Sequence, residues 1–254
     1  MQRKRSTLAS ARGFSLVELL VALGIGILIL GLSLSLVLSS RRLYTLDQAR
    51  TAMNQNLRAA LDLLGADIRQ AGERAPMDLP AVQVSGGNTL VLRRNLLDPV
   101  LTLCDRNGIQ AGSGQDVLFV ARRDNNPPPQ CLPQDGNGNG WDDRLEAFAR
   151  YRQENGGEVT LYLYHPTTGN GEFFPYDAED HSRFHIHRAR GRWAADYPGN
   201  GTTRIYAMEE RRYLLQGDVL TLILNGDTAH PLSLVDRVRG FRVAVRTQDG
   251  SIRT

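Results

Sequence analysis

Residues 14–38 read FSLVELLVALGIGILILGLSLSLVL, an apolar stretch of 25 residues in which Glu18 is the only charged side chain. The 20 uncharged residues after Glu18 would form a helix of about 30 Å, the thickness of the hydrocarbon core of a bilayer. A buried helix in a soluble protein would need apolar neighbours on every side. We therefore expect this segment to span a membrane.

The basic residues are unevenly placed around this stretch. The chain has a formal net charge of +3 and an isoelectric point near 9.1. Arg3, Lys4, Arg5 and Arg12 precede the apolar stretch without any acid, so the net charge without residues 1–13 is −1. The leading charges orient the helix with its N-terminus in the cytoplasm. The near-neutral remainder lacks the bulk charge that is typical of nucleic-acid-binding proteins.

The junction between the basic segment and the apolar stretch reads GFSLVE from Gly13 to Glu18. In an ordinary secretory signal, the apolar stretch comes before the cleavage site rather than after it. The junction resembles the processing signal of type IV prepilins and type II secretion pseudopilins. This resemblance implies that a prepilin peptidase removes residues 1–13 by cleavage after Gly13 and methylates the new N-terminus at Phe14.

Glu18 is an isolated carboxylate in an apolar helix, which costs on the order of 3 kcal/mol on insertion scales. It should therefore have a partner. The resemblance implies that this partner is the N-terminal amine of Phe14, on the same subunit or on a neighbour during assembly. An ion pair in hydrocarbon would fix the axial register of one helix on the next.

The helical pattern continues beyond the membrane segment. Apolar residues recur at steps of three, four and seven, which predicts one face of an amphipathic helix. No proline occurs before Pro76, and Gly72 suits a helix C-cap. We therefore expect one helix from about residue 15 to 71, with a transmembrane half in 14–38 and an amphipathic half in 39–72. The apolar face comprises Leu46, Met53, Leu57, Ala60, Leu61, Leu64, Ile68 and Ala71.

Residues 64–72 read LGADIRQAG, which resembles the end of the helix in PilW-like minor pilins of type IV pili. We expect the apolar members to face a sheet, with Asp67 and Arg69 pointing elsewhere. The resemblance implies a pilin-like α+β fold, a long N-terminal helix packed on an antiparallel β-sheet. It implies a role in initiating pilus assembly or at the filament tip, with minor and major pilins as partners. The location would be the inner membrane, by a single pass, and then the filament.

Residues 73–254 are expected to form an exported, β-rich globular domain. After Pro76 the apolar pattern has a period of two, which is typical of strands. Glycine-containing turns at 86–88, 154–157 and 216–218 predict three hairpins. The expected strands are 82–85, 89–94, 116–122, 145–153, 158–165, 204–215 and 219–225, with a late strand region at 231–238 and 241–246.

The two cysteines, Cys104 and Cys131, both follow the apolar stretch. An exported bacterial domain lies in an oxidising compartment, so we expect a disulfide. Closing a loop of this size stabilises the fold by roughly 3–4 kcal/mol in the chain-entropy model. The alternative, a reactive or metal-bound pair of thiols, lacks a close spacing such as C-x-x-C.

The segment from Asp135 to Glu146 fits the calcium-loop pattern D-x-[DN]-x-[DN]-G-x5-E. Calcium takes six to eight oxygen ligands, and side chains at alternate loop positions can converge on it. Three prolines before the loop and the expected strand after it argue against a complete EF-hand. The segment is either an isolated structural calcium loop or an Asn-Gly-rich turn region. The candidate ligands are Asp135, Asn137, Asn139, the carbonyl of Trp141, Asp143 and Glu146.

Two further clusters were considered between residues 177 and 193. His185 and His187 could bind zinc with Asp177 or Asp180, and a basic run with two aromatic residues could contact nucleic acid. A solvated polar hairpin, including His181, is favoured over both. The basic run comprises Arg183, Arg188, Arg190 and Arg192, with Phe184 and Trp193.

The sequence is therefore compatible with three functions. The first is a minor pilin, and the second is a minor pseudopilin of a type II secretion system, which shares the leader and the long helix. The third is a calcium-dependent tip adhesin or DNA-uptake subunit. No nucleophile–base pair, phosphate-binding loop or paired carboxylates stand out, so we expect no enzymatic activity.

Overall fold

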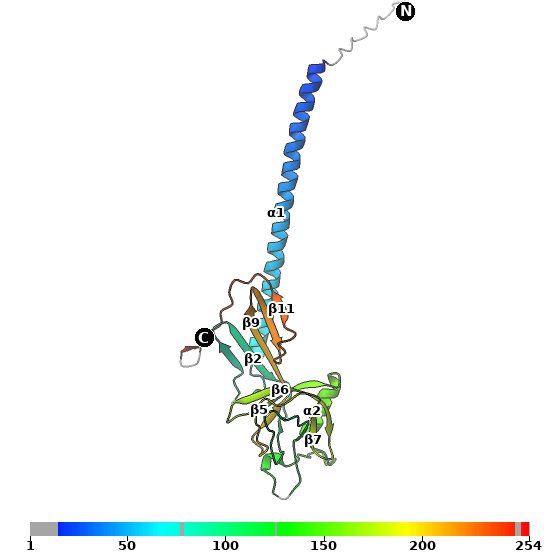
Figure 1. Ribbon diagram of the computed structural model, residues 1–254, viewed down its shortest axis with the longest axis vertical. Coiled ribbons are helices and arrows are strands. Elements are labelled where there is room, and N and C mark those ends of the chain that lie inside the picture. Colours follow the sequence, from blue (N-terminus) through cyan, green and yellow to red (C-terminus); the bar gives the residue numbers. More distant parts are fainter. Residues whose placement is uncertain (1–14, 77–78, 125, 247–249, 254) are drawn as a thin grey trace, which may run out of the picture. The chain divides into compact units, whose positions relative to one another are not determined.

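The computed structural model describes residues 15–76, 79–124, 126–246 and 250–253 of the 254-residue chain. The fold is α+β, with one long N-terminal helix and antiparallel sheets, as expected (Figure 1). The chain divides into two compact units, one that ends at Gln55 and one that begins at Asn56.

Helix α1 (Leu16–Gln70) agrees with the predicted helix to within a residue at each end. Its first turn is closed by a capping box, in which the Ser15 backbone N–H donates to Glu18 Oε2 at 3.1 Å and the Val17 N–H donates to Ser15 Oγ at 3.2 Å. Beyond its last residue, Gly72 has a φ of +86°, which favours glycine and ends the helix.

By length and composition, α1 is the one helix in the described part of the chain that could cross a membrane. Its apolar side chains from Leu16 to Leu38 are largely exposed. A membrane anchor has this composition, and so does a signal sequence.

A five-stranded antiparallel sheet has the order β1-β2-β9-β10-β11 (Figure 1). The predicted hairpins at 86–88 and 216–218 are confirmed, because they join β1 to β2 and β9 to β10. The strands are β1 (Val82–Ser85), β2 (Thr89–Asn95), β9 (Met208–Gln216), β10 (Val219–Leu224) and β11 (Leu232–Val235).

The last turns of α1 pack on this sheet, but by a narrower face than expected. Ala60 is buried, and Leu63, Leu64 and Ala71 are partly buried against apolar residues of the sheet. The predicted members Leu57, Leu61 and Ile68 are exposed. The sheet side chains in this contact are Leu90, Leu92, Tyr213, Leu220 and Leu222, with Val235.

Asp67 corrects the prediction that it points away from the sheet, because it is only 5% exposed. The Tyr213 hydroxyl donates a hydrogen bond to Asp67 Oδ2, and Arg211 Nη1 lies 2.6 Å from Asp67 Oδ1. Both partners come from β9, so a polar side chain takes a place on the packed face of the helix. Arg69 is exposed, as expected.

A second, six-stranded antiparallel sheet has the order β3-β8-β5-β6-β7-β4. It was not expected as a separate sheet, and the predicted strand 204–215 divides between the two sheets as β8 and β9. The strands are β3 (Leu101–Thr102), β4 (Val117–Phe119), β5 (Val159–His165), β6 (Asn170–Asp180), β7 (His185–Arg188) and β8 (Arg204–Tyr206).

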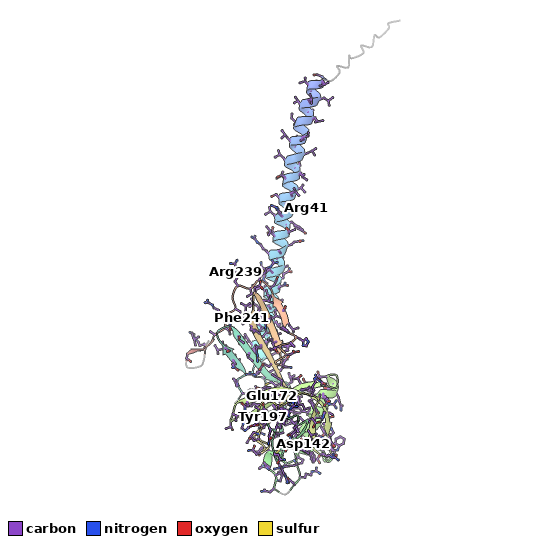
Figure 2. The ribbon with its side chains drawn as sticks, viewed as in Figure 1. Arg41, Asp142, Glu172, Tyr197, Arg239 and Phe241 are labelled. Carbon is purple, nitrogen blue, oxygen red and sulfur yellow. A yellow bond between two sulfur atoms is a disulfide. The ribbon has the colours of Figure 1, made fainter. Side chains whose placement is uncertain are left out.

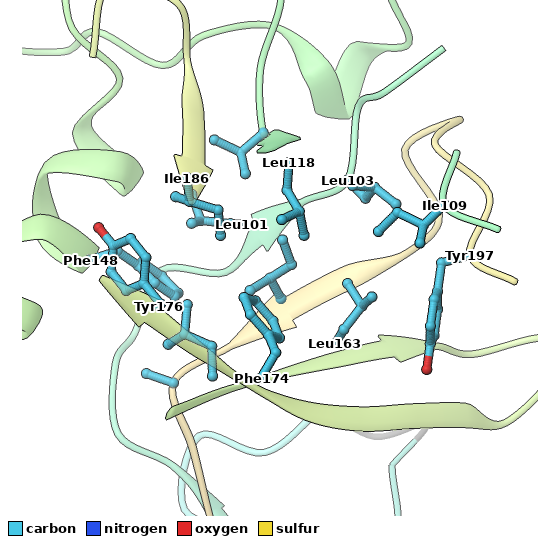
Figure 3. Packing of buried hydrophobic residues seen from close by; sticks show 14 of the residues in the cluster. Leu101, Leu103, Ile109, Leu118, Phe148, Leu163, Phe174, Tyr176, Ile186 and Tyr197 are labelled. Carbon is cyan, nitrogen blue, oxygen red and sulfur yellow. The ribbon is translucent and has the colours of Figure 1, made fainter. Parts of the chain in front are cut away.

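The largest apolar cluster lies on this second sheet. Figure 3 shows Phe148 of helix α2 (Asp143–Glu154) in this core, near Tyr176 of β6. Leu161, Phe174 and Ile186 are fully buried in the same cluster. Arg152 adds a polar anchor for α2, since its Nε and Nη2 lie 2.9 and 2.8 Å from the two carboxylate oxygens of Glu179 on β6.

Helix α2 shows that the predicted strand 145–153, and the hairpin at 154–157, are wrong. Leu145, Phe148 and Ala149 are buried and follow one another at steps of three and one, which places them on one face of a helix. The capping residue Asp142 starts the helix, and strand β5 pairs instead with β6 and β8.

The late strand region is only partly confirmed. Strand β11 covers Leu232–Val235, but residues 241–244 form no strand, and β12 (Val245–Arg246) pairs with β13 (Ile252–Arg253) as a separate two-stranded sheet. Phe241 packs against the apolar clusters between α1 and the five-stranded sheet. The expected strand 116–122 is also shorter, since β4 covers Val117–Phe119.

Candidate functional site: the loop from Asp135 to Glu146

The base of the candidate calcium loop is closed by Asp142, whose side chain is fully buried. Figure 2 labels this residue. Its Oδ1 accepts hydrogen bonds from the backbone N–H groups of Arg144 and Leu145, at 2.9 and 3.2 Å, which caps α2. Its Oδ2 accepts from the N–H of Gln134 at 3.0 Å. One carboxylate therefore fixes both ends of the loop.

Arg144 neutralises this buried carboxylate, with Nη2 2.7 Å from Asp142 Oδ2. The same guanidinium donates to the carbonyls of Gln130 and Leu132, at 3.2 and 3.1 Å. These carbonyls flank Cys131, which ends the short 3-10 helix η1 (Pro129–Cys131).

The expected disulfide is confirmed, since Cys104 and Cys131 are bonded and both are buried. It closes a loop with a sequence separation of 27. The entry to the calcium loop is thus tethered by a covalent bond and by the Asp142–Arg144 pair.

Within the loop, the side chains at alternate positions bind the backbone. Asp135 Oδ2 accepts from the Gly140 N–H at 2.8 Å, and Asp143 Oδ2 accepts from the Gly136 N–H at 2.7 Å. Asn137 Oδ1 accepts from the N–H two residues ahead at 2.9 Å, and Asn139 Oδ1 does the same at 2.8 Å. The loop therefore curls around its own polar side chains.

Glu146 joins this arrangement from the first turn of α2. Its two carboxylate oxygens accept hydrogen bonds from Asn137 Nδ2 at 3.1 Å and from Asn139 Nδ2 at 2.8 Å. The helix brings Glu146 back over the loop because residues three and four apart share a face. Two of the predicted ligands thus contact a third directly.

The side-chain oxygens of the loop that accept no hydrogen bond show whether the loop suits calcium. Asp135 Oδ1 and Asp143 Oδ1 are buried and have no hydrogen-bond partner, an arrangement that costs free energy unless a cation or a donor meets them. Three carboxylates and two amides are the oxygen ligands that calcium prefers. Rotation of the two asparagine amides would turn their oxygens toward Glu146. The chemical types of these side chains suit this ion.

The carboxylates of the loop alone would not form a calcium site. In the described ranges, no three side chains of His, Cys, Asp or Glu gather closely enough to hold a metal ion. A cation here would also need the two asparagine oxygens and the carbonyl of Trp141. Helix α2 follows the loop directly, as the exiting helix follows the loop of an EF-hand. The sequence-based argument against such a helix was wrong.

Two neighbours of the loop were not predicted from the sequence. The Trp141 ring stacks on the His181 ring, with centroids 4.6 Å apart and planes at 20°, although Trp141 is 46% exposed. Arg123 Nη2 donates to the carbonyl of Gly140 at 3.1 Å. The loop therefore contacts the turn between β6 and β7, and a change in its conformation would move an exposed indole ring.

The histidine cluster forms the predicted hairpin between β6 and β7, but its members have different surroundings. His187 Nδ1 lies 2.6 Å from Asp177, and its Nε2 lies 3.4 Å from Asp116, so both ring nitrogens already have carboxylate partners. The hydrogen bond to Asp177 raises the pKa of His187 above its usual value. His185 instead packs edge-on against Phe119, and burial lowers its pKa.

The aromatic residues considered for nucleic-acid stacking are covered. Trp193 is 1% exposed and lies under the guanidinium of Arg188, whose Cζ is 3.9 Å from the ring centroid. Phe184 is also buried, and Arg123 lies over its ring. Arg190 is paired with Glu158 at 2.7 Å. These rings cannot stack on a base in this conformation.

The processing residues Gly13 and Phe14 lie outside the described residues. Glu18, the proposed assembly residue, lies in the first turn of α1, where its Oε2 caps the helix. The chain matches no protein-family model, no curated protein and no solved structure.

Proposed function

We propose that the chain is a minor pilin of a type IV pilus, anchored in the inner membrane and active in assembly initiation or at the filament tip. The observation that supports this most directly is α1, which begins with 23 residues from Leu16 to Leu38 that include one charge and ends packed on an antiparallel sheet. Its exposed apolar side chains need lipid or other helices around them. An anchored subunit that leaves the bilayer for a filament meets both conditions.

The leader adds a chemical step to this proposal. A prepilin peptidase would cut after Gly13 and leave the amine of Phe14 four residues before Glu18. Glu18 Oε2 caps its own helix, and Oε1 makes no hydrogen bond with the described residues, so it is available for an amine. The carboxylate could therefore cap one helix and bind the N-terminus of a neighbouring subunit at once.

The decisive experiment separates these two roles of Glu18. Glutamine supports a capping box nearly as well as glutamate, but it carries no charge. We expect Glu18→Gln and Glu18→Ala to be cleaved and inserted normally, and both to be lost from sheared filaments. Ser15→Ala, which removes only the hydroxyl of the capping box, is the matched control and should assemble.

Two outcomes would contradict the proposal. Efficient incorporation of Glu18→Gln would show that the charge is not needed. Normal pili in normal number after deletion of the gene would remove the assembly role, and a simultaneous loss of protein secretion would favour the pseudopilin function instead.

Calcium is proposed as a structural cofactor of the same protein. The supporting observation is that Asp135 and Asp143 each have a buried oxygen without a hydrogen-bond partner in a loop whose two asparagine amides contact Glu146. Calcium would order the loop between the disulfide and α2, and it would supply only charge and coordination. A surface at the filament tip would then depend on calcium.

The fluorescence of Trp141 can report calcium binding, because its exposed ring stacks on His181 at the edge of the loop. Calcium added to the detergent-solubilised full chain should change its fluorescence in a saturable way, and Asp135→Ala should abolish the change. Asp236→Ala, at an exposed aspartate outside the loop, is the control. No saturable change, and no heat in a calorimetric titration, would remove calcium from the proposal.

A further inference from the structure

The loop from Asp135 to Glu146 contains two asparagines that directly precede glycines. An asparagine before a glycine can lose ammonia without an enzyme, because the glycine nitrogen can attack the side-chain carbonyl carbon and no Cβ obstructs its approach. The reaction needs a side chain folded towards the next peptide and a backbone N–H that can give up its proton. Seven asparagines of the chain are followed by glycine: Asn107, Asn137, Asn139, Asn155, Asn170, Asn200 and Asn225.

Three of these asparagines fold their side chains forward along the chain. The Oδ1 atoms of Asn137 and Asn139 accept hydrogen bonds from the backbone N–H two residues ahead, at 2.9 and 2.8 Å. Asn200 Oδ1 accepts in the same way from the Thr202 N–H at 3.2 Å. This contact holds the side-chain carbonyl over the following peptide. The N–H donor also stabilises the negative charge that forms on the carbonyl oxygen during attack.

The other four asparagines make no such contact with the described part of the chain. Asn155 Nδ2 donates backwards to a carbonyl of α2 at 2.8 Å. Asn225 Oδ1 accepts from a backbone N–H of the neighbouring strand β9 at 2.8 Å. The side chains of Asn107 and Asn170 form no forward hydrogen bond to a described residue. These four side chains are therefore not held over the next peptide.

The glycine N–H distinguishes the three forward-folded asparagines. The attacking atom is the glycine nitrogen after it has lost its proton, so a hydrogen bond donated by this N–H has to be broken first. The Gly140 N–H donates to Asp135 Oδ2 at 2.8 Å, where like charge would also disfavour the deprotonated nitrogen. The Gly201 N–H donates to the Leu103 carbonyl at 3.2 Å. The Gly138 N–H donates no hydrogen bond within the described ranges.

We propose that Asn137 is a site of spontaneous deamidation, since it combines the forward-folded side chain with an unengaged glycine N–H. The Gly138 nitrogen forms a bond to Asn137 Cγ, the Cγ–Nδ2 bond breaks, and Nδ2 leaves as ammonia with the proton that the Gly138 nitrogen has lost. Water then opens the cyclic succinimide to aspartate or isoaspartate. Both residues are exposed, so water reaches the ring. Water is the co-reactant, and no atom is oxidised or reduced.

Deamidation changes the loop at a defined contact. Asn137 Nδ2 donates to Glu146 Oε2 at 3.1 Å, and the product has an oxygen in place of this donor. Two carboxylates then face each other, so they repel in the metal-free loop and bind a cation more strongly. The consequence for calcium rests on the proposed calcium loop, whereas the reaction itself does not need the ion. Converted and unconverted chains differ in the charge of an exposed surface.

The test incubates the full chain in neutral detergent and a mildly alkaline buffer that contains a chelator. Peptide mass spectrometry measures the fraction of each asparagine that has become an acid. Asn137 should convert about tenfold or more faster than Asn139, whose glycine N–H donates to a carboxylate. It should convert several-fold faster than Asn200. In denaturant the three rates should become similar, because the hydrogen bonds that distinguish them are lost.

Asp135→Ala is the matched variant, because it removes the acceptor of the Gly140 N–H. It should raise the rate of Asn139 towards that of Asn137, and an unchanged Asn139 rate in the folded variant would contradict the proposal. Equal rates of the two asparagines in the folded wild type would also contradict it, as would an Asn137 that stays an amide. A preference for Asn137 that persists in denaturant would assign the effect to the sequence alone. If Asp135→Ala does not fold, the wild-type comparison with Asn200 decides the outcome.

Discussion

Asp67 illustrates how one residue can define the position of a helix on a sheet. Its two carboxylate oxygens bind different side chains of β9, Arg211 and the buried hydroxyl of Tyr213. Burial and the hydrogen bond to Asp67 raise the pKa of Tyr213, so the hydroxyl stays protonated and donates. Arg211 is also held by Glu209 at 2.8 Å. A shift of α1 by one residue would break both bonds to Asp67.

Asp67→Ala should therefore lower the free energy of unfolding by about 1–3 kcal/mol, because it leaves the buried Tyr213 hydroxyl without its acceptor and removes one of the two acids that bind Arg211. Asp67→Asn keeps an acceptor for Tyr213 and should cost less. Asp62→Ala, at an exposed position on the same helix, should change stability by less than about 0.5 kcal/mol. Denaturant unfolding of the full chain in detergent checks the order, and equal effects of Asp62→Ala and Asp67→Ala would contradict it.

His187 gives the fold a pH dependence with a defined sign. Its pKa in the folded protein is raised above the ordinary 6.5 by the hydrogen bond to Asp177 and by the more distant Asp116. Protonation therefore stabilises the fold below the unfolded pKa, and this contribution is lost as the pH rises through the folded value. The side chain is 35% exposed, so solvent screening keeps the effect modest.

We expect His187 to lower the melting temperature as the pH rises from about 6 to about 8. His185, whose pKa is lowered by burial, acts in the opposite direction over this range. The same titration in His187→Gln should lack this component, while His230→Gln, at a side chain that is 83% exposed, should keep it. A wild-type protein that becomes more stable over this range, with the change absent in His187→Gln, would show that the sign is wrong.

At the scale of elements, the sequence predicted helix α1 but not helix α2. Helix α1 could be predicted because a long apolar run and an amphipathic continuation are strong local signals. Helix α2 was missed because residues 145–153 precede the glycine-containing turn at 154–157 and so resemble one strand of a hairpin, although Phe148 breaks the alternation of apolar and polar residues. Asp142, the capping residue that marks the start of the helix, also lies inside the calcium-loop pattern. The capping signal and the loop signal overlap at this residue.

The environment of Asp67 could not be predicted for a different reason. Its partners lie 144 and 146 residues further along the chain, and no local pattern shows which acid of a helix will meet them. The calcium loop could be predicted in part. Its ligand types could be listed from the sequence, but their convergence depends on α2, which carries Glu146 back over the loop.

Asp142 should matter more than any proposed calcium ligand for the element that follows it. Asp142→Ala removes the cap of α2 and leaves the guanidinium of Arg144 buried without its partner, which should cost about 3–5 kcal/mol. Asp142→Asn keeps the cap and should cost less. Asp143→Asn, one residue later, should change calcium binding and leave the melting temperature of the metal-free protein nearly unchanged. If Asp142→Ala unfolds like the wild type, the loop base is not held as described.

For the whole molecule, the distribution of charge predicts its orientation in a membrane. Four basic residues precede the apolar stretch, and Arg41 and Arg42 follow it. Replacing the four leading residues by glutamine should reduce the fraction of chains whose C-terminal part is translocated, because cationic flanks are retained in the cytoplasm. A C-terminal reporter of compartment measures this fraction. Replacing Arg41 and Arg42 instead should not reduce it, and the opposite result would exclude the orientation proposed here.

The bond between Asp67 and β9 also sets an order in time. During synthesis the chain emerges from its N-terminus at about 5–20 residues per second, so Asp67 precedes Tyr213 by roughly 7–30 seconds. Throughout this interval the end of α1 has been synthesised, but the strands that will cover Asp67 and the apolar face of the helix have not. The nascent chain must therefore spend many seconds with an exposed apolar surface. Its yield should depend on how quickly it is escorted through that interval as much as on the stability of the finished fold.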